Sequence, residues 1–140
     1  MRRWLIFVPV IVLTVGCGRH KLVPVSGRVT LNNNPLANAY VSFQPTGSGE
    51  REPGPGSYGT TDGDGRFTLQ LVGKDQPGAW VGHHRVVISL KDPPNPNEVS
   101  DSASRDRTEK LPLRYNRDSK LTFDVPAGGS DAANFDLTDP

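Results

Sequence analysis

Apolar residues recur at every second position in several short segments of this 140-residue chain, and turn-forming residues separate the segments. The clearest segment is 22–31, where Val23, Val25, Val29 and Leu31 alternate with polar or small residues. Successive side chains of a β-strand point to opposite faces, so this period predicts strands that bury one face. The 15 glycines and 13 prolines also disfavour long helices. The pattern therefore predicts a chain built from short strands.

The same alternation indicates further strands along the chain. It recurs in segments 39–44, 58–61, 66–72, 84–90, 121–125 and 134–138. With 22–31 these make seven short strands, and no amphipathic helix longer than a turn stands between them. We therefore predict an all-β fold, a seven-stranded antiparallel β-sandwich. Segment 72–81 is expected to be a crossing loop, in which Trp80 caps the open end of the sandwich.

The N-terminus has the pattern of an export signal. A basic head, Met1-Arg2-Arg3, precedes the uncharged run 4–15. A membrane-spanning helix needs about 20 apolar residues, so this run suits a signal peptide better than a span. The residues Thr14-Val15-Gly16-Cys17 resemble a bacterial lipoprotein signal box, which implies lipidation of Cys17, the single cysteine of the chain. The alternative is a plain signal peptide followed by a chance cysteine.

These features predict the organisation of the chain. We expect a signal peptide over residues 1–16, a lipidated tether over 17–22 and one domain over 23–138. Acyl chains attached to Cys17 would hold the exported protein on a membrane. Gly18, in place of Asp, follows the cysteine. By resemblance to the sorting habit of diderm bacteria, it favours the outer membrane over the inner membrane.

Several short patterns together resemble a known family. They are Val25-x-Gly27-x-Val29, Asn34-Pro35-Leu36, Ala39-x-Val41-x-Phe43, Thr61-Asp62-Gly63-Asp64-Gly65-x-Phe67 and Gly82-x-His84-x-Val86-x-Ile88. They are similar to carboxypeptidase regulatory-like domains, and Leu111-Pro112-x-Arg114-Tyr115-Asn116 is similar to the version in small lipoproteins of planctomycete-type bacteria. The resemblance implies a transthyretin-like (prealbumin-like), immunoglobulin-like sandwich. It also implies a non-catalytic accessory or binding module.

Charge and cysteine content exclude some functions. The formal net charge is +1, so no basic excess points to nucleic acid. One cysteine permits no internal disulfide framework and no cysteine-rich metal cluster. His83 and His84 are neighbours on a predicted strand, so they point to opposite faces and cannot hold one ion together. We therefore expect no metal and no cofactor.

The segment Asp62-Gly63-Asp64-Gly65 invites comparison with a calcium-binding loop. Counted from Asp62, however, the fifth position is Arg66 and the twelfth is Gly73, where oxygen ligands are required. We expect a structural turn, in which the glycines supply positive φ and the carboxylates accept backbone hydrogen bonds. Weak calcium binding is the alternative.

No catalytic constellation stands out, so we expect a protein that is not an enzyme. Transthyretin-like hydrolases end in Tyr-Arg-Gly-Ser, whereas this chain ends Leu137-Thr138-Asp139-Pro140. Such a hydrolase stays as a remote alternative.

The sequence therefore predicts a structural or interaction module of the cell envelope. It would bind a protein or a glycan through loops 45–57 and 91–110, or through a free sheet edge. The runner-up is a carbohydrate-binding module. Strand parity does not place the aromatic residues Tyr40, Tyr58, Trp80 and Tyr115 on one face. The candidate ligand contacts are Trp80, His83 and Tyr115.

Overall fold

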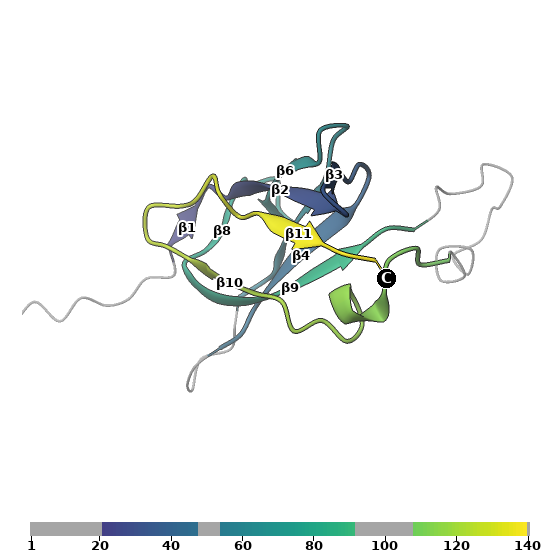
Figure 1. The fold of residues 1–140 in the computed structure, drawn as a ribbon. Helices are drawn as coiled ribbons and strands as arrows, with labels where there is room; N and C mark the ends of the chain where they lie inside the picture. Colours follow the sequence, from purple (N-terminus) through teal and green to yellow (C-terminus); the bar gives the residue numbers. More distant parts are fainter. Residues whose placement is uncertain (1–20, 48–53, 92–107, 140) are drawn as a thin grey trace, which may run out of the picture.

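A computed structural model describes residues 21–47, 54–91 and 108–139 (Figure 1). The predicted signal peptide and Cys17 lie outside these residues. The described part consists of strands, turns and one short 3₁₀ helix, η1 (Leu113–Tyr115), and it contains no α-helix. The all-β prediction is confirmed. Within the described ranges, no helix has the length and apolar character needed to cross a bilayer.

The strands form two main sheets. The larger has the order β10-β9-β4-β5-β7 and is antiparallel throughout: β10 (Thr122–Val125), β9 (Gly82–Ser89), β4 (Tyr40–Pro45), β5 (Ser57–Thr60) and β7 (Gln70–Leu71). The second is centred on β2 (Ser26–Leu31), which pairs with β11 (Phe135–Leu137), β3 (Asn34–Pro35) and β6 (Arg66–Thr68). A small pair joins β1 (Leu22–Val23) to β8 (Ala79–Trp80).

The core lies between these two sheets, and Phe43 is at its centre. Figure 1 shows β11 and β2 lying over β4 and β9. The Phe43 ring on β4 lies 6.1 Å from the Phe135 ring on β11, measured between ring centroids. Phe43 is fully buried, as the alternation of segment 39–44 predicts. The two sheets therefore pack face to face in a sandwich-like arrangement.

The predicted strand 22–31 is divided in the structure. Residues Leu22–Val23 pair with β8, while Ser26–Leu31 pair with strands of the second sheet. Pro24 lies at the division, and proline has no N–H to donate to a ladder. The expectation of one continuous strand over 22–31 was wrong.

The predicted strand 66–72 also serves both sheets. Its first part, β6, pairs with β2, and its last part, β7, pairs with β5. Between them the backbone N–H of Leu69 donates to Val25 (2.9 Å) and its carbonyl accepts from Gly78 (2.7 Å). Phe67, Leu69 and Leu71 all point inward, so the period of two continues unbroken across the change of sheet.

Two further expectations need correction. Segment 72–81 is not only a crossing loop, because β8 pairs there with β1. The sandwich is not wholly antiparallel, because β11 runs parallel to β2, with Phe135 opposite Val29 and Leu137 opposite Leu31. Residues 126–134 carry the chain from the end of the large sheet to the second sheet, so that β11 enters in the direction of β2.

Candidate functional site

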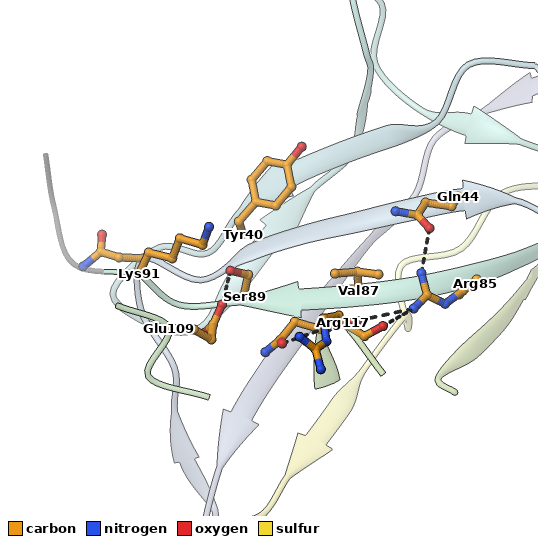
Figure 2. A pocket seen from close by; sticks show the side chains of 10 residues that line it. Tyr40, Gln44, Arg85, Val87, Ser89, Lys91, Glu109 and Arg117 are labelled. Carbon is orange, nitrogen blue, oxygen red and sulfur yellow. Dashed lines mark hydrogen bonds between the residues drawn. The ribbon is translucent and has the colours of Figure 1, made fainter. Parts of the chain in front are cut away.

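A cavity of about 710 Å³ lies on the outer face of the large sheet (Figure 2). Its floor comes from β4 and β9, and its walls come from the chain around Lys91 and Glu109 and from the turn after η1. The residues that line it are Asn38, Tyr40, Gln44, Arg85, Val87, Ser89, Lys91, Glu109, Asn116 and Arg117.

Strand parity and register place the floor residues. Tyr40 and Gln44 on β4 alternate with the buried residues of that strand, so they point away from the core. In the β4–β9 pair Tyr40 lies opposite Ser89, and Gln44 lies opposite Arg85. The two ends of the floor are therefore about 13 Å apart, from four residues of strand rise. Figure 2 shows Tyr40 at one end and Gln44 with Arg85 at the other.

Arg85 ties one wall of the cavity to the sheet. Its Nε donates to the carbonyl of Ser119 (3.0 Å), and its Nη2 donates to the carbonyls of Arg117 (3.1 Å) and Asn116 (3.4 Å). Its Nη1 donates to Oε1 of Gln44 (3.0 Å) on the neighbouring strand. These hydrogen bonds of the guanidinium therefore hold the turn that follows η1 against β9.

Glu109 fixes the opposite wall. Its Oε1 accepts from the backbone N–H groups of Leu90 (2.8 Å) and Leu111 (3.0 Å), and its Oε2 accepts from the Ser89 hydroxyl (2.5 Å). Charge-assisted hydrogen bonds of this kind are among the stronger ones in proteins. The carboxylate is thus occupied in holding residues 109–111 against the end of β9.

A stacked aromatic pair borders the cavity. The rings of Tyr40 and Tyr58 lie 5.6 Å apart at an interplanar angle of 21°. Tyr58 stands on β5, and its hydroxyl accepts from Nε2 of Gln70 (2.5 Å). Tyr40 therefore both stacks on Tyr58 and lines the cavity. Burial, and then the proximity of Tyr58, raise the pKa of the Tyr40 hydroxyl, so it stays protonated and can donate.

Two of the four aromatic residues considered in the sequence share one face. Tyr40 and Tyr58 lie on the outer face of the large sheet, because the register pairs Tyr40 with Thr60 and Tyr58 with Ser42. Trp80 on β8 and Tyr115 in η1 lie elsewhere, so the four are not gathered on one face. The stacking of Tyr40 on Tyr58 depends on the β4–β5 register, which the sequence of either strand does not reveal.

The three candidate contact residues do not come together at the cavity, and none of them lines it. Trp80 is partly buried on β8, and its indole N–H donates to the carbonyl of Pro55 (3.1 Å). His83 is exposed on β9, and its Nδ1 lies 2.5 Å from Oδ1 of Asp124 on β10. Each therefore has a local partner of its own.

Tyr115 anchors the last strand. Its buried hydroxyl donates to the carbonyl of Thr138 (3.0 Å) and accepts from the N–H of the same residue (2.9 Å). The guanidinium of Arg114 lies over the Tyr115 ring, 4.9 Å from its centroid, and also donates to the Thr138 carbonyl. These contacts hold the end of β11 against η1.

The Asp62–Gly65 segment forms a tight turn between β5 and β6. Oδ1 of Asp62 accepts from the backbone N–H groups of Asp64 and Arg66, both at 2.9 Å. Gly65 has φ of 75°, a conformation that favours glycine. Among the described residues, no group of three His, Cys, Asp or Glu side chains is placed to hold a metal ion.

Replacing Asp62 by alanine is expected to lower the free energy of unfolding by about 1–2 kcal/mol, because two backbone donors lose their acceptor. Asp62→Asn keeps an acceptor oxygen and should lose less. Urea titration of the variants measures both effects. Asp64→Ala is the control, with an expected change within about 0.5 kcal/mol. A rise in melting temperature on adding millimolar calcium to the parent protein, absent in Asp62→Ala, would contradict a purely structural role.

The core contains two polar side-chain atoms without a hydrogen-bond partner among the described residues, Nε2 of His84 and Oγ of Ser57. His84 is 1% exposed and packs against the Phe43 ring at 5.8 Å, while its Nδ1 donates to the carbonyl of Gly82 (3.0 Å). Burial lowers the pKa of His84 below 6.5, and His83 adds to this, against the raising effects of the Gly82 hydrogen bond and of Asp124. The imidazole is therefore neutral in the folded protein near pH 7.

This burial predicts a loss of stability in mild acid. The unfolded chain takes up a proton on His84 below pH about 6.5 while the folded protein resists it, so stability is full above that pH and falls below it. The slope is at most about 1.4 kcal/mol per pH unit. Urea titrations between pH 7.5 and about 5 measure it. The slope should flatten in His84→Leu and persist in His83→Gln; an undiminished slope in His84→Leu would show that burial of His84 is not its cause.

The cavity coincides in part with the site expected from the sequence, because Lys91 and Glu109 of the expected loop 91–110 line it, whereas no described residue of 45–57 does. The expected loops, 45–57 and 91–110, lie partly outside the described residues. The sequence does indicate the floor of the cavity, because the outward face of segments 39–44 and 84–90 carries Tyr40, Gln44, Arg85 and the apolar Val87. Comparison of the chain with protein-family models, curated proteins and solved structures gave no match.

Proposed function

We propose that this chain is an exported, lipid-anchored and non-catalytic binding module of the cell envelope, and that its ligand is a glycan held in the outer-face cavity. The observation that carries the proposal is the Tyr40 ring, which stacks on Tyr58 and lines a cavity of about 710 Å³. A rigid aromatic ring loses little conformational freedom on binding.

The other lining groups suit a sugar. Asn38 and Gln44 bring amide groups to the cavity, and Ser89 brings a hydroxyl. Ligand sites combine an apolar surface with a few fixed polar groups that orient the ligand, and the polar groups here stand on strands or on a turn that Arg85 holds. A sugar offers both an apolar ring face and hydroxyls for such groups.

The lining also supports a binding role without catalysis. Its only hydroxyl–carboxylate pair is Ser89 with Glu109, and the same carboxylate accepts two backbone N–H groups. Neither histidine nor cysteine lines the cavity in the described part of the chain. A transthyretin-like hydrolase would need groups positioned to activate a nucleophile.

We further propose that the fold is the transthyretin-like sandwich of carboxypeptidase regulatory-like domains, preceded by a signal peptide over 1–16 and anchored through Cys17 in the outer membrane. The two facing sheets and the Asp62–Gly65 turn support this assignment. The intact mass of protein extracted from membranes tests the anchor. A mass increase by acyl chains on Cys17 is expected, and cytosolic protein with residues 1–16 retained would overturn it.

The glycan site is tested with the full chain, purified in detergent, on a glycan array. Binding is expected and should be lost in Tyr40→Ala. Val72→Ala is the matched control, because Val72 is also exposed but does not line the cavity. Trp80→Ala should retain binding, since Trp80 lies elsewhere. Absence of glycan binding by the parent protein, or undiminished binding by Tyr40→Ala, would overturn the proposal.

A protein partner is the second candidate, and the position of β10 favours it. β10 is the outermost strand on one side of the large sheet. The N–H of Val86 donates to Leu121, so by the alternation of antiparallel ladders the backbone groups of Thr122 and Asp124 face away from β9. Such an edge can accept a further strand. Crosslinking in cell envelopes should capture a partner that Thr122→Pro fails to capture.

A further inference from the structure

We infer that the glycan bound in the outer-face cavity is acidic, and that the cavity holds its carboxylate groups with Arg85, Lys91 and Arg117. This inference rests on the proposed function and gives the chemical class of the ligand. It follows from the charges of the lining and from how each of them is already paired.

The first observation is the Arg85 guanidinium. All four of its hydrogen-bond partners are neutral: the carbonyls of Ser119, Asn116 and Arg117, and the Gln44 amide oxygen. Arg85 is partly buried and lines the cavity, so its positive charge stands at the floor without a carboxylate to balance it. A partly buried charge without a counter-charge attracts an anion more strongly than an exposed one.

The second observation is that the one acidic residue of the lining is already occupied. Glu109 accepts from Ser89, Leu90 and Leu111, and this holds the wall in place. No other Asp or Glu lines the cavity in the part of the chain that the structure describes. Among the described residues the lining therefore carries one carboxylate against the three cationic side chains of Arg85, Lys91 and Arg117.

The third observation is that, among the described residues, neither of the other two cations is held in a buried ion pair. Within the described residues Lys91 is exposed and has no carboxylate within 4 Å. Nε of Arg117 lies 3.7 Å from Oδ1 of Asp118, and both side chains are largely exposed. Exposed pairs of this kind contribute little, so Arg117 can exchange Asp118 for a ligand carboxylate.

The arrangement of these groups suits an acidic oligosaccharide. Figure 2 shows Lys91 and Tyr40 at one end of the cavity and Arg85 at the other, with Arg117 beside β9. A sugar ring against Tyr40 would leave the next residues of the chain beside Arg117 and Arg85. The Arg117 guanidinium can bind a planar carboxylate through paired hydrogen bonds. Arg85 already uses four of its five N–H groups, so it contributes its charge and one remaining donor. Uronic acids are among the sugars that carry a carboxylate, and they serve as the probes.

Calorimetry with the full chain in detergent tests the inference. The probes are oligogalacturonate and oligomannuronate, each compared with its methyl ester, which has the same skeleton without the charge. At least one acid is expected to bind about tenfold more tightly than its ester at low salt, and the difference should shrink as salt rises. Lys91→Gln and Arg117→Gln should each weaken binding of the acid several-fold and leave the ester unchanged, with Lys74→Gln as the exposed control outside the lining.

The outcomes separate this inference from the function on which it rests. If esters or neutral glycans bind as well as the acids, and Tyr40→Ala abolishes that binding, the glycan module stands and the acidic ligand is overturned. If no glycan binds, both are overturned. If polyglutamate binds more tightly than the acids, the cavity recognises an acidic peptide, and the inference fails in favour of a protein partner. Preference for sulfated glycans over uronates would equally overturn it.

Discussion

Replacing Phe43 by alanine is expected to lower the free energy of unfolding by about 3–5 kcal/mol, the range for a buried phenylalanine in a packed core. Phe43 has no exposed surface. Its ring lies between 5.6 and 6.5 Å from four others, those of Phe67, His84, Phe123 and Phe135. These rings come from both sheets, so the cavity left by alanine cannot close by a shift of one strand.

Chemical denaturation monitored by circular dichroism measures this loss. Leu113→Ala provides the control, because Leu113 is an apolar side chain with 48% of its surface exposed, and its loss should change stability by less than about 0.5 kcal/mol. Phe43→Leu, which keeps much of the volume, should fall between the two. Equal stability of Phe43→Ala and Leu113→Ala would mean that the sheets do not meet at this ring.

The longer strands were predictable because each buries one face, whereas the two-residue strands β3 and β8 were not expected. All seven segments with a period of two contain strands, since alternation records which side chains leave water. Which strands pair with one another was harder to predict from the sequence. Leu69 and Leu71 continue the pattern of Phe67, yet β6 and β7 belong to different sheets. A period of two shows which face of a strand is buried, but it does not show to which sheet the strand belongs.

The candidate site could not be predicted from such patterns, because it depends on contacts between residues far apart in the sequence. Arg85 holds its cavity wall through carbonyls more than 30 residues along the chain, and these are backbone groups that every residue carries. Tyr40 and Tyr58 stack because of the β4–β5 register. Local sequence signals identify turns such as Asp62–Gly65, where the donors lie within four residues of the acceptor.

The second large effect is expected at Gly27, where alanine should destabilise the protein by about 3 kcal/mol or more. A Cβ built on Gly27 would collide with the carbonyl oxygen of Ala133, a backbone atom that cannot rotate away. On either side of this contact, Ala133 donates to the Ser26 carbonyl (3.1 Å) and the Arg28 N–H donates to Oδ1 of Asn134 (3.0 Å). A methyl group at this position would force the chain before β11 away from β2.

Gly63→Ala is the matched control, because a Cβ at Gly63 meets nothing within 4 Å and the residue does not have positive φ. Its expected effect is within about 0.5 kcal/mol, so any large loss in Gly27→Ala reports the contact and not the general cost of replacing glycine. Hydrogen exchange gives a second readout, since protection of Leu137 and its neighbours in β11 should fall in Gly27→Ala before that of β4 and β9. Equal stability of the two alanine variants would show that β11 does not lie against β2 at this distance, and the parallel pairing would then be wrong.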